Sequence, residues 1–394
     1  MKYLVFCLFI TACYANDLNG AVANFSLELL HNKNTETAKN IVFSPFSVWT
    51  LLTSVALGAS GNSRTELERT LRLPLDLNEL KTDYKNLTNT VLDSQIEDVT
   101  IKSNNYIFVD NGFDILPGYQ NTVTSDFGTQ IVRLDFKDSK VAAKKANDIM
   151  KESGGTTSDV MDADDFSTSR MILTNIISFK GFWTTPFNET DTEADAFYDE
   201  SGRHIGTVKM MYRRAEVPYS SIEAVQSHVV ELSYGSDDKF SMLVLLPYPK
   251  IKVMDIYKRL TVEVLQFIFE KLESDMYEFD LGIVDLKLPR FQINSNILLN
   301  SALNRMGVCD IFNQSAANFD NISKENIHIS KIIHKANIEV TEAGTDASAD
   351  TSAYIINRIF PSSFIANRPF IYLIMEKTTK TILFSGIYSE PSLF

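Results

Sequence analysis

Residue types that often carry chemistry are present in this chain, but their spacing matches no catalytic or metal-binding motif. The five histidines (His31, His204, His228, His328 and His334) form no H-E-x-x-H or H-x-x-E-H pair, so a zinc protease is not indicated. There is no G-x-S-x-G elbow, P-loop or G-x-G-x-x-G motif. The acidic cluster Asp159–Asp165 lacks the Gly and the terminal Glu of a calcium-binding loop. We therefore expect no catalytic residues, no metal and no cofactor.

One segment near the C-terminus has an unusual alternation. From Thr345 onward, small weakly polar residues (Thr345, Ala347, Ala349, Thr351 and Ala353) alternate with hydrophilic ones (Asp346, Ser348, Asp350 and Ser352). A period of two is typical of a strand with one side packed against the protein, yet Ala, Asp and Ser are poor strand formers. Two interpretations remain open: a loop that becomes a strand when a sheet opens, and a polar exposed linker.

The elements that must position such a segment are helices and strands in mixed order. Helical spacing of apolar residues predicts helices over Leu18–Leu30, Ser47–Leu57, Thr65–Leu92, Lys140–Lys151, Asp255–Leu272 and Ile297–Met306. Short β-branched and aromatic runs predict strands at Asn105–Val109, Met171–Phe179, His228–Leu232, Met242–Leu246, Val284–Leu288 and Tyr372–Met375. No linker divides the chain and no repeat is visible, so we expect a single mixed α+β domain.

Composition limits the function classes further. The 394 residues include 37 basic and 50 acidic side chains, for a net charge of −13, with 44% hydrophobic and 22% charged residues. This balance is typical of a globular protein. It argues against a nucleic-acid partner, which would require a basic face. No run of apolar residues is long enough to predict a membrane-spanning helix, so a membrane partner is not expected.

The first fifteen residues, MKYLVFCLFITACYA, have the pattern of a secretory signal peptide with cleavage after Ala15. The sequence therefore predicts a secreted, extracellular protein comprising residues 16–394. Removal of the signal leaves Cys309 as the single cysteine, which we expect to be a buried small apolar residue. Five N-x-S/T triplets predict glycosylation in such a protein, at Asn24, Asn86, Asn188, Asn313 and Asn321, with Asn24 the weakest because it lies inside a helical pattern.

The chain resembles the serpin family over essentially its whole length. The resemblance is carried, in the family's order, by NIVFSPFSV (Asn40–Val48), ALGASG (Ala56–Gly61), TNIISFKGFWTTPF (Thr174–Phe187), VKMMY (Val208–Tyr212), VVELSY (Val229–Tyr234), LPRF (Leu288–Phe291), HKANIEVTEAGTDASA (His334–Ala349), NRPFIYLI (Asn367–Ile374) and LFSGIYSEP (Leu383–Pro391). Departures are small: Ser63 replaces the usual Thr, and Ser233 the usual Pro.

The resemblance implies a serpin fold. It predicts one domain with three β-sheets, eight to nine helices and an exposed reactive loop at about residues 342–365. It also implies inhibition of a protease, because serpins trap their targets by inserting the cleaved loop into a β-sheet. Some fifteen inserted residues, at about 3.3 Å each, would carry an attached protease about 50 Å.

The hinge before the loop separates inhibitory serpins from non-inhibitory ones. Residues that match the inhibitory pattern are Glu342, Gly344, Thr345, Ala347, Ser348, Ala349 and Thr351, whereas Asp346 and Asp350 depart from it. The alternation places both aspartates on the outward face, where a carboxylate stays hydrated. Insertion would then bury neither charge nor bulk.

The family's spacing from Glu342 places the cleaved bond between Arg358 and Ile359. Arg358 is also the only basic residue between Lys335 and Arg368. An arginine side chain fits the specificity pocket of a trypsin-like serine protease, whose base carries an acidic residue. The alternatives are an ordinary solvated arginine, or a shift of one residue that names Asn357 or Ile359.

Two further sites follow from the resemblance. Ser44, Ser47, Asn175 and His334 should form a polar cluster that controls the opening of the sheet, and Trp183, Arg290 and Glu342 should mark the place of first loop insertion. We expect Arg290 to pair with Glu342. In the helical region Leu75–Thr90, Lys81 and Lys85 are offset by Asp76, Glu79 and Asp83, so heparin is not expected as a partner.

The favoured function is thus a secreted suicide-type inhibitor that forms a covalent complex with trypsin-like serine proteases and acts as a monomer. The alternative is a non-inhibitory member that serves as a carrier, storage or signalling protein.

Overall fold

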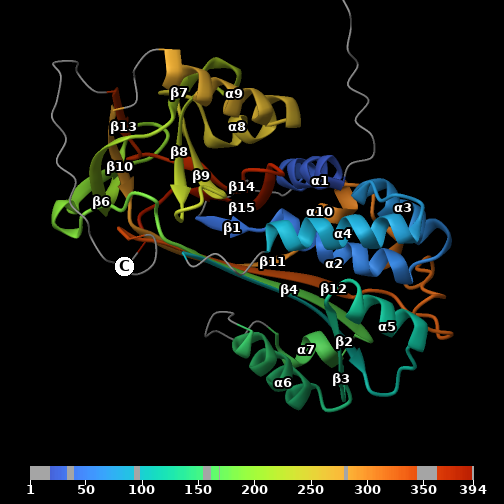
Figure 1. Cartoon of the computed structure of the whole chain (residues 1–394). Coiled ribbons are helices and arrows are strands. Elements are labelled where there is room, and N and C mark those ends of the chain that lie inside the picture. The colour runs from blue at the N-terminus through green and yellow to red at the C-terminus, as the bar shows by residue number, and fades with distance from the viewer. Residues whose placement is uncertain are drawn as a thin grey trace, which may run out of the picture.

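The computed structural model describes residues 18–32, 40–92, 98–153, 161–167, 169–278, 283–343 and 362–392. Within these ranges the chain forms three β-sheets and ten α-helices (Figure 1). The helices are α1 (Leu18–Asn32), α2 (Pro45–Gly58), α3 (Gly61–Leu71), α4 (Leu77–Val91), α5 (Pro117–Ser125), α6 (Ser139–Glu152), α7 (Ala163–Ser167), α8 (Val253–Arg259), α9 (Val262–Glu278) and α10 (Asn300–Arg305). The α+β class and the three sheets are confirmed, and the helix number slightly exceeds the expected eight or nine.

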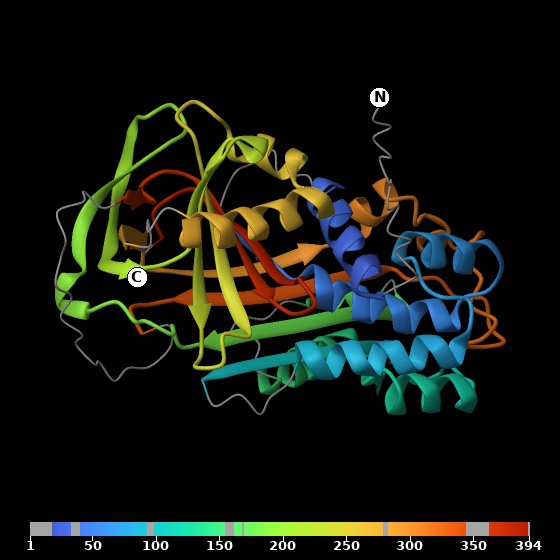
Figure 2. The ribbon, with the colours of Figure 1, turned by 45° about the horizontal axis from the view of Figure 1, so that its top comes forward.

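The five-stranded sheet carries the candidate site. Its strands lie in the order β11 (Phe291–Leu298), β12 (Lys331–Val340), β4 (Met171–Gly181), β2 (Val99–Asp110) and β3 (Thr129–Leu134). The long strands run side by side across the molecule, with α6 on one face and α2 on the other (Figures 1 and 2). The central pair, β12 and β4, is parallel, whereas each of these strands is antiparallel to its outer neighbour.

The other two sheets form the remaining half of the domain. The six-stranded sheet has the order β1 (Ile41–Phe43), β15 (Thr381–Tyr388), β14 (Phe370–Glu376), β9 (Phe240–Pro247), β8 (Ser227–Tyr234) and β7 (Tyr219–Ile222). The four-stranded sheet has the order β13 (Ser362–Ile365), β10 (Ile283–Pro289), β6 (His204–Glu216) and β5 (Glu193–Tyr198). All residues of β9, β14 and β15 are buried, which accounts for their nearly continuous apolar runs.

Helix α2 joins the sheets. It begins after Ser44, whose hydroxyl accepts a hydrogen bond from the Ser47 N–H, with Pro45 in the first turn. Almost every residue of α2 is buried, because the helix contacts β15 on one side and β2 and β4 on the other. This position places Ser44 and Ser47 directly beneath the five-stranded sheet.

The structure corrects three predicted helices. The region 65–92 is two helices, because Arg72 ends α3 in the left-handed conformation, at φ 52°, and Pro74 follows. The region 255–272 is likewise divided between α8 and α9. Ile297 and Leu298 belong to β11, and the helix predicted there is confined to Asn300–Arg305.

Candidate functional site

The parallel pairing of β12 and β4 covers only part of their length. Lys331 stands opposite Ile172, and the register continues to Asn337 opposite Ser178. Beyond Asn337, β12 is paired with β11 alone up to Val340. A chain that turned back after β12 would run antiparallel to both β12 and β4, because those two strands are parallel. The sheet has a second parallel pair, β2 and β3, but the chain that leaves β12 lies at the central pair, so one more antiparallel strand formed by that chain fits there.

A buried polar cluster holds this pair together. His334 and Asn175 are opposite each other in the ladder, and Nδ1 of His334 lies 2.8 Å from Oδ1 of Asn175. The Ser47 hydroxyl donates to the same amide oxygen at 2.6 Å, and the Ser44 N–H donates to Nε2 of His334 at 2.8 Å. The structure thus brings together the four residues expected to form the cluster. All four are fully buried, so each lost hydrogen bond would leave a polar group without water.

The cluster extends to two residues that the sequence analysis missed. Asn175 Nδ2 donates to Oδ1 of Asn105 at 2.6 Å, and Asn105 Nδ2 donates to the Thr50 hydroxyl at 3.0 Å. That hydroxyl in turn donates to the carbonyl of Ser47. Asn105 begins the apolar run of β2, so a lone amide beside that run was the signal available in the sequence. The network thereby joins β12, β4, β2 and α2.

Glu342 lies just beyond the end of β12, at the open end of the central pair. Its carboxylate oxygen Oε2 is 3.5 Å from Nη1 of Arg290, and the Thr192 hydroxyl donates to Oε1 at 2.9 Å. The carboxylate is buried and the guanidinium is 30% exposed, so the pair is partly shielded from solvent. Arg290 and Glu342 are therefore in contact as expected, and Thr192 is an additional partner.

Trp183 holds the chain that leads into the loop. Its indole Nε1–H donates to the carbonyl of Thr341 at 2.9 Å, and its N–H donates to the carbonyl of Ala343 at 3.1 Å. The indole stacks on Tyr234, with ring centroids 4.2 Å apart. Burial raises the pKa of Tyr234 well above its ordinary value, so that phenol stays neutral. Trp183 thus holds residues 341–343, the last described residues before the loop, through two hydrogen bonds.

The reactive-loop predictions lie outside the described residues. These are the hinge residues Gly344, Thr345, Ala347, Ala349 and Thr351 and the bond between Arg358 and Ile359. The chain is described again from Ser362, where β13 pairs in parallel with β10 of the four-stranded sheet. The segment is therefore held by β12 at one end and β13 at the other.

The predicted glycosylation sites differ in their surroundings. Asn86, Asn188, Asn313 and Asn321 are exposed. Asn24 is half-buried in α1, and its amide donates to the carbonyl of Gly20 at 2.8 Å. Glycosylation stays a prediction at each position.

Cys309 is an exposed free cysteine, so the expectation of burial is wrong. Its backbone N–H donates to Glu66 at the start of a short 3-10 helix, Asp310–Phe312.

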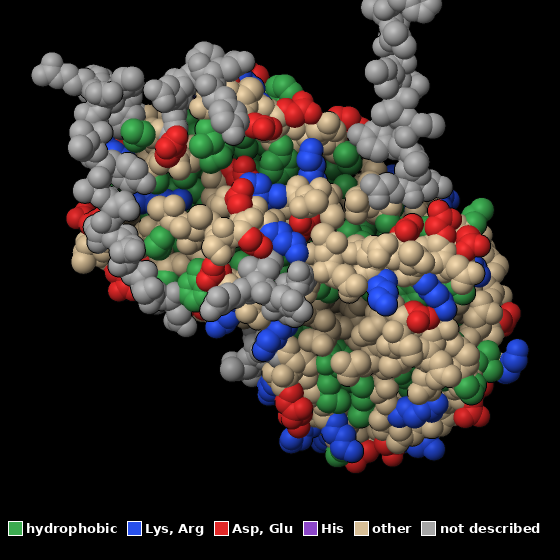
Figure 3. Space-filling model, in the orientation of Figure 1, with side chains coloured by type: hydrophobic (Ala, Val, Ile, Leu, Met, Phe, Trp, Pro, Cys, Tyr) green, Lys and Arg blue, Asp and Glu red, His purple; other side chains and the backbone are tan. Residues whose placement is uncertain are grey.

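Charges on the described surface are mixed. Lys81 of α4 pairs with Asp126 at 2.7 Å, and Figure 3 shows basic and acidic side chains interspersed over the face drawn there. The absence of heparin binding stays a prediction.

Among the described residues, no group of three or more His, Cys, Asp or Glu side chains could hold a metal ion. None of the helices in those ranges is long and apolar enough to cross a membrane.

Comparisons with known proteins agree with the geometry. The family model described as "Serpin (serine protease inhibitor)" matches residues 20–391. Leukocyte elastase inhibitor A of Mus musculus is 31% identical over 385 residues, covering 95% of this chain and 99% of the relative. Serpin B8 of Homo sapiens is 28% identical over 383 residues, covering 95% and 100%. The crystal structure of mouse protein-Z dependent protease inhibitor is 25% identical, with a TM-score of 0.82, covering 96% and 98%.

The predicted localisation is contradicted by these comparisons. The matching relatives, leukocyte elastase inhibitors and serpin B8, are intracellular serpins that lack signal peptides. The prediction of a secreted, extracellular protein rested only on the residue types of positions 1–15. Those positions lie outside the described residues and precede the family match, which begins at residue 20. A short apolar run after a lysine is a compositional pattern, and it is outweighed here by the relatives.

Proposed function

Because the chain belongs to the serpin family of serine protease inhibitors, we propose that it inhibits trypsin-like serine proteases through cleavage at Arg358 and insertion of the cleaved loop between β12 and β4. The family is named for its serine protease inhibitors, which are not enzymes themselves and act on serine proteases through a covalent complex. The proposal concerns the target class, the bond that is cleaved and the route of trapping.

One observation supports insertion above all others. The central strands of the five-stranded sheet are parallel and lose their pairing after Asn337, next to the point where Glu342 leads into the loop. A returning chain would complete an antiparallel ladder with both neighbours, and each added hydrogen bond contributes about 1 kcal/mol net. The side chains that would face the interior after insertion, at alternate positions from Thr345 to Ala353, are only Thr and Ala. Insertion would therefore bury no charge.

Arg358 supports the trypsin-like target. The serine of the protease would attack the carbonyl carbon of Arg358, the peptide bond to Ile359 would break, and the new amine of Ile359 would take the proton from the catalytic histidine. The ester between serine and Arg358 would be trapped when insertion carries the protease away from its starting position. Water would then fail to complete the hydrolysis.

A second target class is favoured by the relatives. Leukocyte elastase inhibitors of mouse and human are 31% and 30% identical over 95% of this chain. If the cleaved bond lay one residue later, the aliphatic side chain of Ile359 would enter the specificity pocket of the protease in place of Arg358. Cleavage after Ile359 would correspond to an elastase-like protease, whereas cleavage after Arg358 corresponds to trypsin.

One experiment separates these targets. The protein is incubated in parallel with trypsin and with leukocyte elastase, the products are separated on denaturing gels, and the new N-terminus is sequenced. We expect an SDS-stable complex with trypsin and cleavage between Arg358 and Ile359. Arg358→Ala should abolish the complex with trypsin, whereas Lys137→Ala, an exposed residue between β3 and α6, should not.

Three results would contradict the proposal in different ways. A complex with elastase alone, cleaved after Ile359, would favour the second target class. Clean cleavage by trypsin without a complex would favour a non-inhibitory carrier, storage or signalling role. Absence of any cleavage in the loop would show that the bond is wrongly assigned.

The monomeric state stays a prediction, which the mass of the uncleaved protein in solution tests.

A further inference from the structure

Arg368, between β13 and β14, carries a half-buried guanidinium that forms no ion pair with any described carboxylate. Its Nε and Nη2 donate to the carbonyl of Pro247, at 3.2 and 2.6 Å. Burial lowers the pKa of Arg368 from its ordinary value, and no described carboxylate opposes that shift. Because an arginine keeps its proton in proteins, a positive charge stays here partly desolvated and without a counter-charge.

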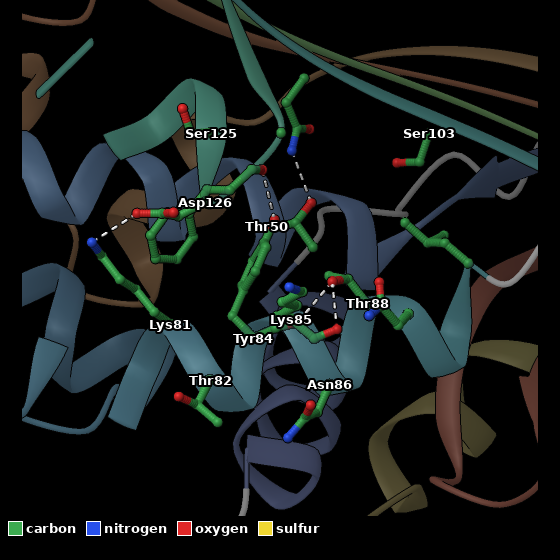
Figure 4. A pocket seen from close by; sticks show the side chains of 15 residues that line it. Thr50, Lys81, Thr82, Tyr84, Lys85, Asn86, Thr88, Ser103, Ser125 and Asp126 are labelled. Atoms are coloured by element: carbon green, nitrogen blue, oxygen red, sulfur yellow. Dashed lines mark hydrogen bonds and ion pairs between the residues drawn. The ribbon is translucent and has the colours of Figure 1, made fainter. Parts of the chain in front are cut away.

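Two other basic side chains show the more usual arrangement. In the cavity drawn in Figure 4, between α4 and β2, Lys81 pairs with Asp126 at 2.7 Å, as the dashed line shows. Arg203, between β5 and β6, pairs with Asp199 at 3.0 Å. In each pair the carboxylate offsets the charge that an external anion would otherwise meet. Arg368 lacks such a carboxylate among the described residues.

Aromatic and hydroxyl side chains surround the same place. Tyr248 directly follows Pro247, and its ring meets the imidazole of His228 with centroids 4.9 Å apart. The ring of Tyr219 lies nearly parallel to that imidazole, with centroids 6.1 Å apart. Ser221 of β7 stands opposite His228 of β8 in the ladder. We call these four residues and Arg368 the Arg368 cluster. The three rings are half-buried, so part of each is open to a ligand.

Several hydrogen-bond donors of the cluster have no described acceptor. Nη1 of Arg368 and Nε2 of His228 make no hydrogen bond within the described ranges, and neither atom is fully enclosed. The Tyr219 hydroxyl lies 3.0 Å from Nδ1 of His228; when it donates there, the imidazole hydrogen lies on Nε2. The hydroxyls of Ser221 and Tyr248 are 2.8 Å apart, and that bond uses only one of their two hydrogens.

These donors suit a phosphate better than a carboxylate. One bidentate edge of the guanidinium is already used by the Pro247 carbonyl, which removes one of the paired geometries that a carboxylate prefers. The remaining donors come from β7, from β8 and from the chain on either side of β9 and β14. A phosphate monoester offers three acceptor oxygens and a charge of about −1.5 to −2 at pH 7, so it can accept from separate donors.

The electrostatic surroundings of His228 agree with an anion at this place. The charged and titratable groups that face it are Tyr219 from β7, Tyr248 after β9 and Arg368 before β14. Burial, followed by the charge of Arg368, lowers the pKa of His228, and no described carboxylate raises it. A bound anion would relieve the repulsion between the imidazolium and the guanidinium.

We propose that the Arg368 cluster binds a phosphate monoester that carries a flat ring. The phosphoryl oxygens accept from Nη1 of Arg368, from Nε2 of His228 and from the unused hydroxyl hydrogen of Ser221 or Tyr248. The flat ring of the ligand packs on the half-buried tyrosine rings. Because Tyr219 also contacts Phe364 of β13, with centroids 6.4 Å apart, the site lies beside the strand that follows the reactive loop. Binding does not depend on the proposed function.

Binding is measured by calorimetric titration of the full chain in a buffer free of phosphate. The probes are phenyl phosphate, inorganic phosphate, phenylacetate and phenol. We expect phenyl phosphate to bind best, inorganic phosphate and phenylacetate to bind more weakly, and phenol not to bind. Arg368→Gln, which removes the charge, should weaken phenyl phosphate by about tenfold or more. Arg203→Gln, the same change at a paired arginine, should leave the affinity unchanged.

A second readout uses the wild-type protein, so it does not depend on the folding of a variant. The imidazole resonances are followed by NMR as the pH is changed, with and without saturating phenyl phosphate, and the resonance missing in His228→Gln is that of His228. A bound dianion favours the protonated imidazole, so the pKa of His228 should rise. The exposed His204 is the reference and should not shift.

Four outcomes overturn the proposal. Absence of binding by phenyl phosphate, or equal affinity in Arg368→Gln and the wild type, shows that the cluster is not the site. Tighter binding of phenylacetate than of phenyl phosphate overturns the phosphate class, and equal affinities of phenyl phosphate and inorganic phosphate overturn the contact with a flat ring. Binding that leaves the pKa of His228 unchanged shows that the anion lies elsewhere.

Discussion

His334 of β12 and Asn175 of β4 stand opposite each other in the parallel ladder and share a hydrogen bond of 2.8 Å between Nδ1 and Oδ1. The Ser44 N–H donates to Nε2 of the same imidazole, so Nε2 carries no proton and Nδ1 carries the donated hydrogen. The imidazole is therefore neutral and connects the two central strands to α2. A strand cannot enter between β12 and β4 until this contact breaks.

The first prediction concerns that imidazole. His334→Ala removes two hydrogen bonds in a fully buried site and leaves the Ser44 N–H without its acceptor. We expect a loss of about 2 to 4 kcal/mol of stability and faster polymer formation, because the central strands separate more readily. Thermal unfolding and native gels after mild heating measure the two effects. His328→Ala is the control; equal behaviour of the two variants would contradict the role of His334.

The second prediction concerns the pair of Glu342 and Arg290. Glu342→Lys places an ammonium beside the guanidinium in a buried site and removes the acceptor of the Thr192 hydroxyl. Breaking a buried pair and adding repulsion should cost about 3 kcal/mol, and the open end of the strands should widen. We expect faster loop insertion and polymer formation. The charge swap Arg290→Glu with Glu342→Lys should partly restore wild-type rates; polymer formation that is unchanged in the single variant would refute this account.

The third prediction is a pH dependence at the far end of the six-stranded sheet. His228 of β8 lies 3.0 Å from the Tyr219 hydroxyl, and burial, followed by the nearby charge of Arg368, lowers its pKa below the ordinary 6.5. The folded protein therefore binds this proton less readily than the unfolded chain. The stability that His228 contributes is complete above pH 6.5 and is lost as the pH falls through the lowered value.

Thermal unfolding between about pH 7 and about pH 5 measures this contribution. His228→Gln cannot take up a proton, so its unfolding temperature should fall less steeply over this range than that of the wild type. Every other group is the same in the two proteins, so its contribution cancels in the comparison. Identical slopes in the two proteins would show that His228 does not contribute.

Local patterns predicted the elements well where apolar spacing was unbroken, as in α1 and β4. They failed where the chain turns without glycine: Arg72 adopts a positive φ and divides one predicted helix into two. They also failed at Ile297, where the predicted helix begins too early. Ile297 and Leu298 are the last residues of β11, and the helix starts only at Asn300. In each case the boundary depends on contacts with distant elements, which local spacing does not contain.

The candidate site was less accessible to sequence reasoning than the fold. The contact of Arg290 with Glu342 was expected from the resemblance alone, because Arg290, between β10 and β11, and Glu342, beyond β12, are far apart in the sequence. Thr192, which precedes β5, and Tyr234, at the end of β8, were missed for the same reason, since both lie far in the sequence from the residues that they contact. Asn105 could have been found, because an amide at the start of a buried apolar run requires a buried partner.

The last prediction compares two adjacent hinge residues, Thr345 and Asp346. Successive side chains of an inserted strand point to opposite faces of the sheet, and the alternation assigns Thr345 to the inward face and Asp346 to the outward one. Thr345→Arg would bury a guanidinium above α2 without a partner, whereas Asp346→Arg would keep its charge in water. The two variants carry the same new side chain one position apart.

Thr345→Arg should be cleaved by trypsin after Arg358 and released without a complex, because insertion becomes slower than hydrolysis of the acyl-enzyme. A barrier raised by about 1.4 kcal/mol already slows insertion tenfold, and an unpaired buried charge costs more than that. Asp346→Arg should form the complex as the wild type does. Gel separation of complex from cleaved inhibitor, at several ratios of inhibitor to trypsin, measures this partition. Loss of the complex in Asp346→Arg with retention in Thr345→Arg would reverse the assigned faces, and equal loss in both would show that the hinge does not insert as an alternating strand.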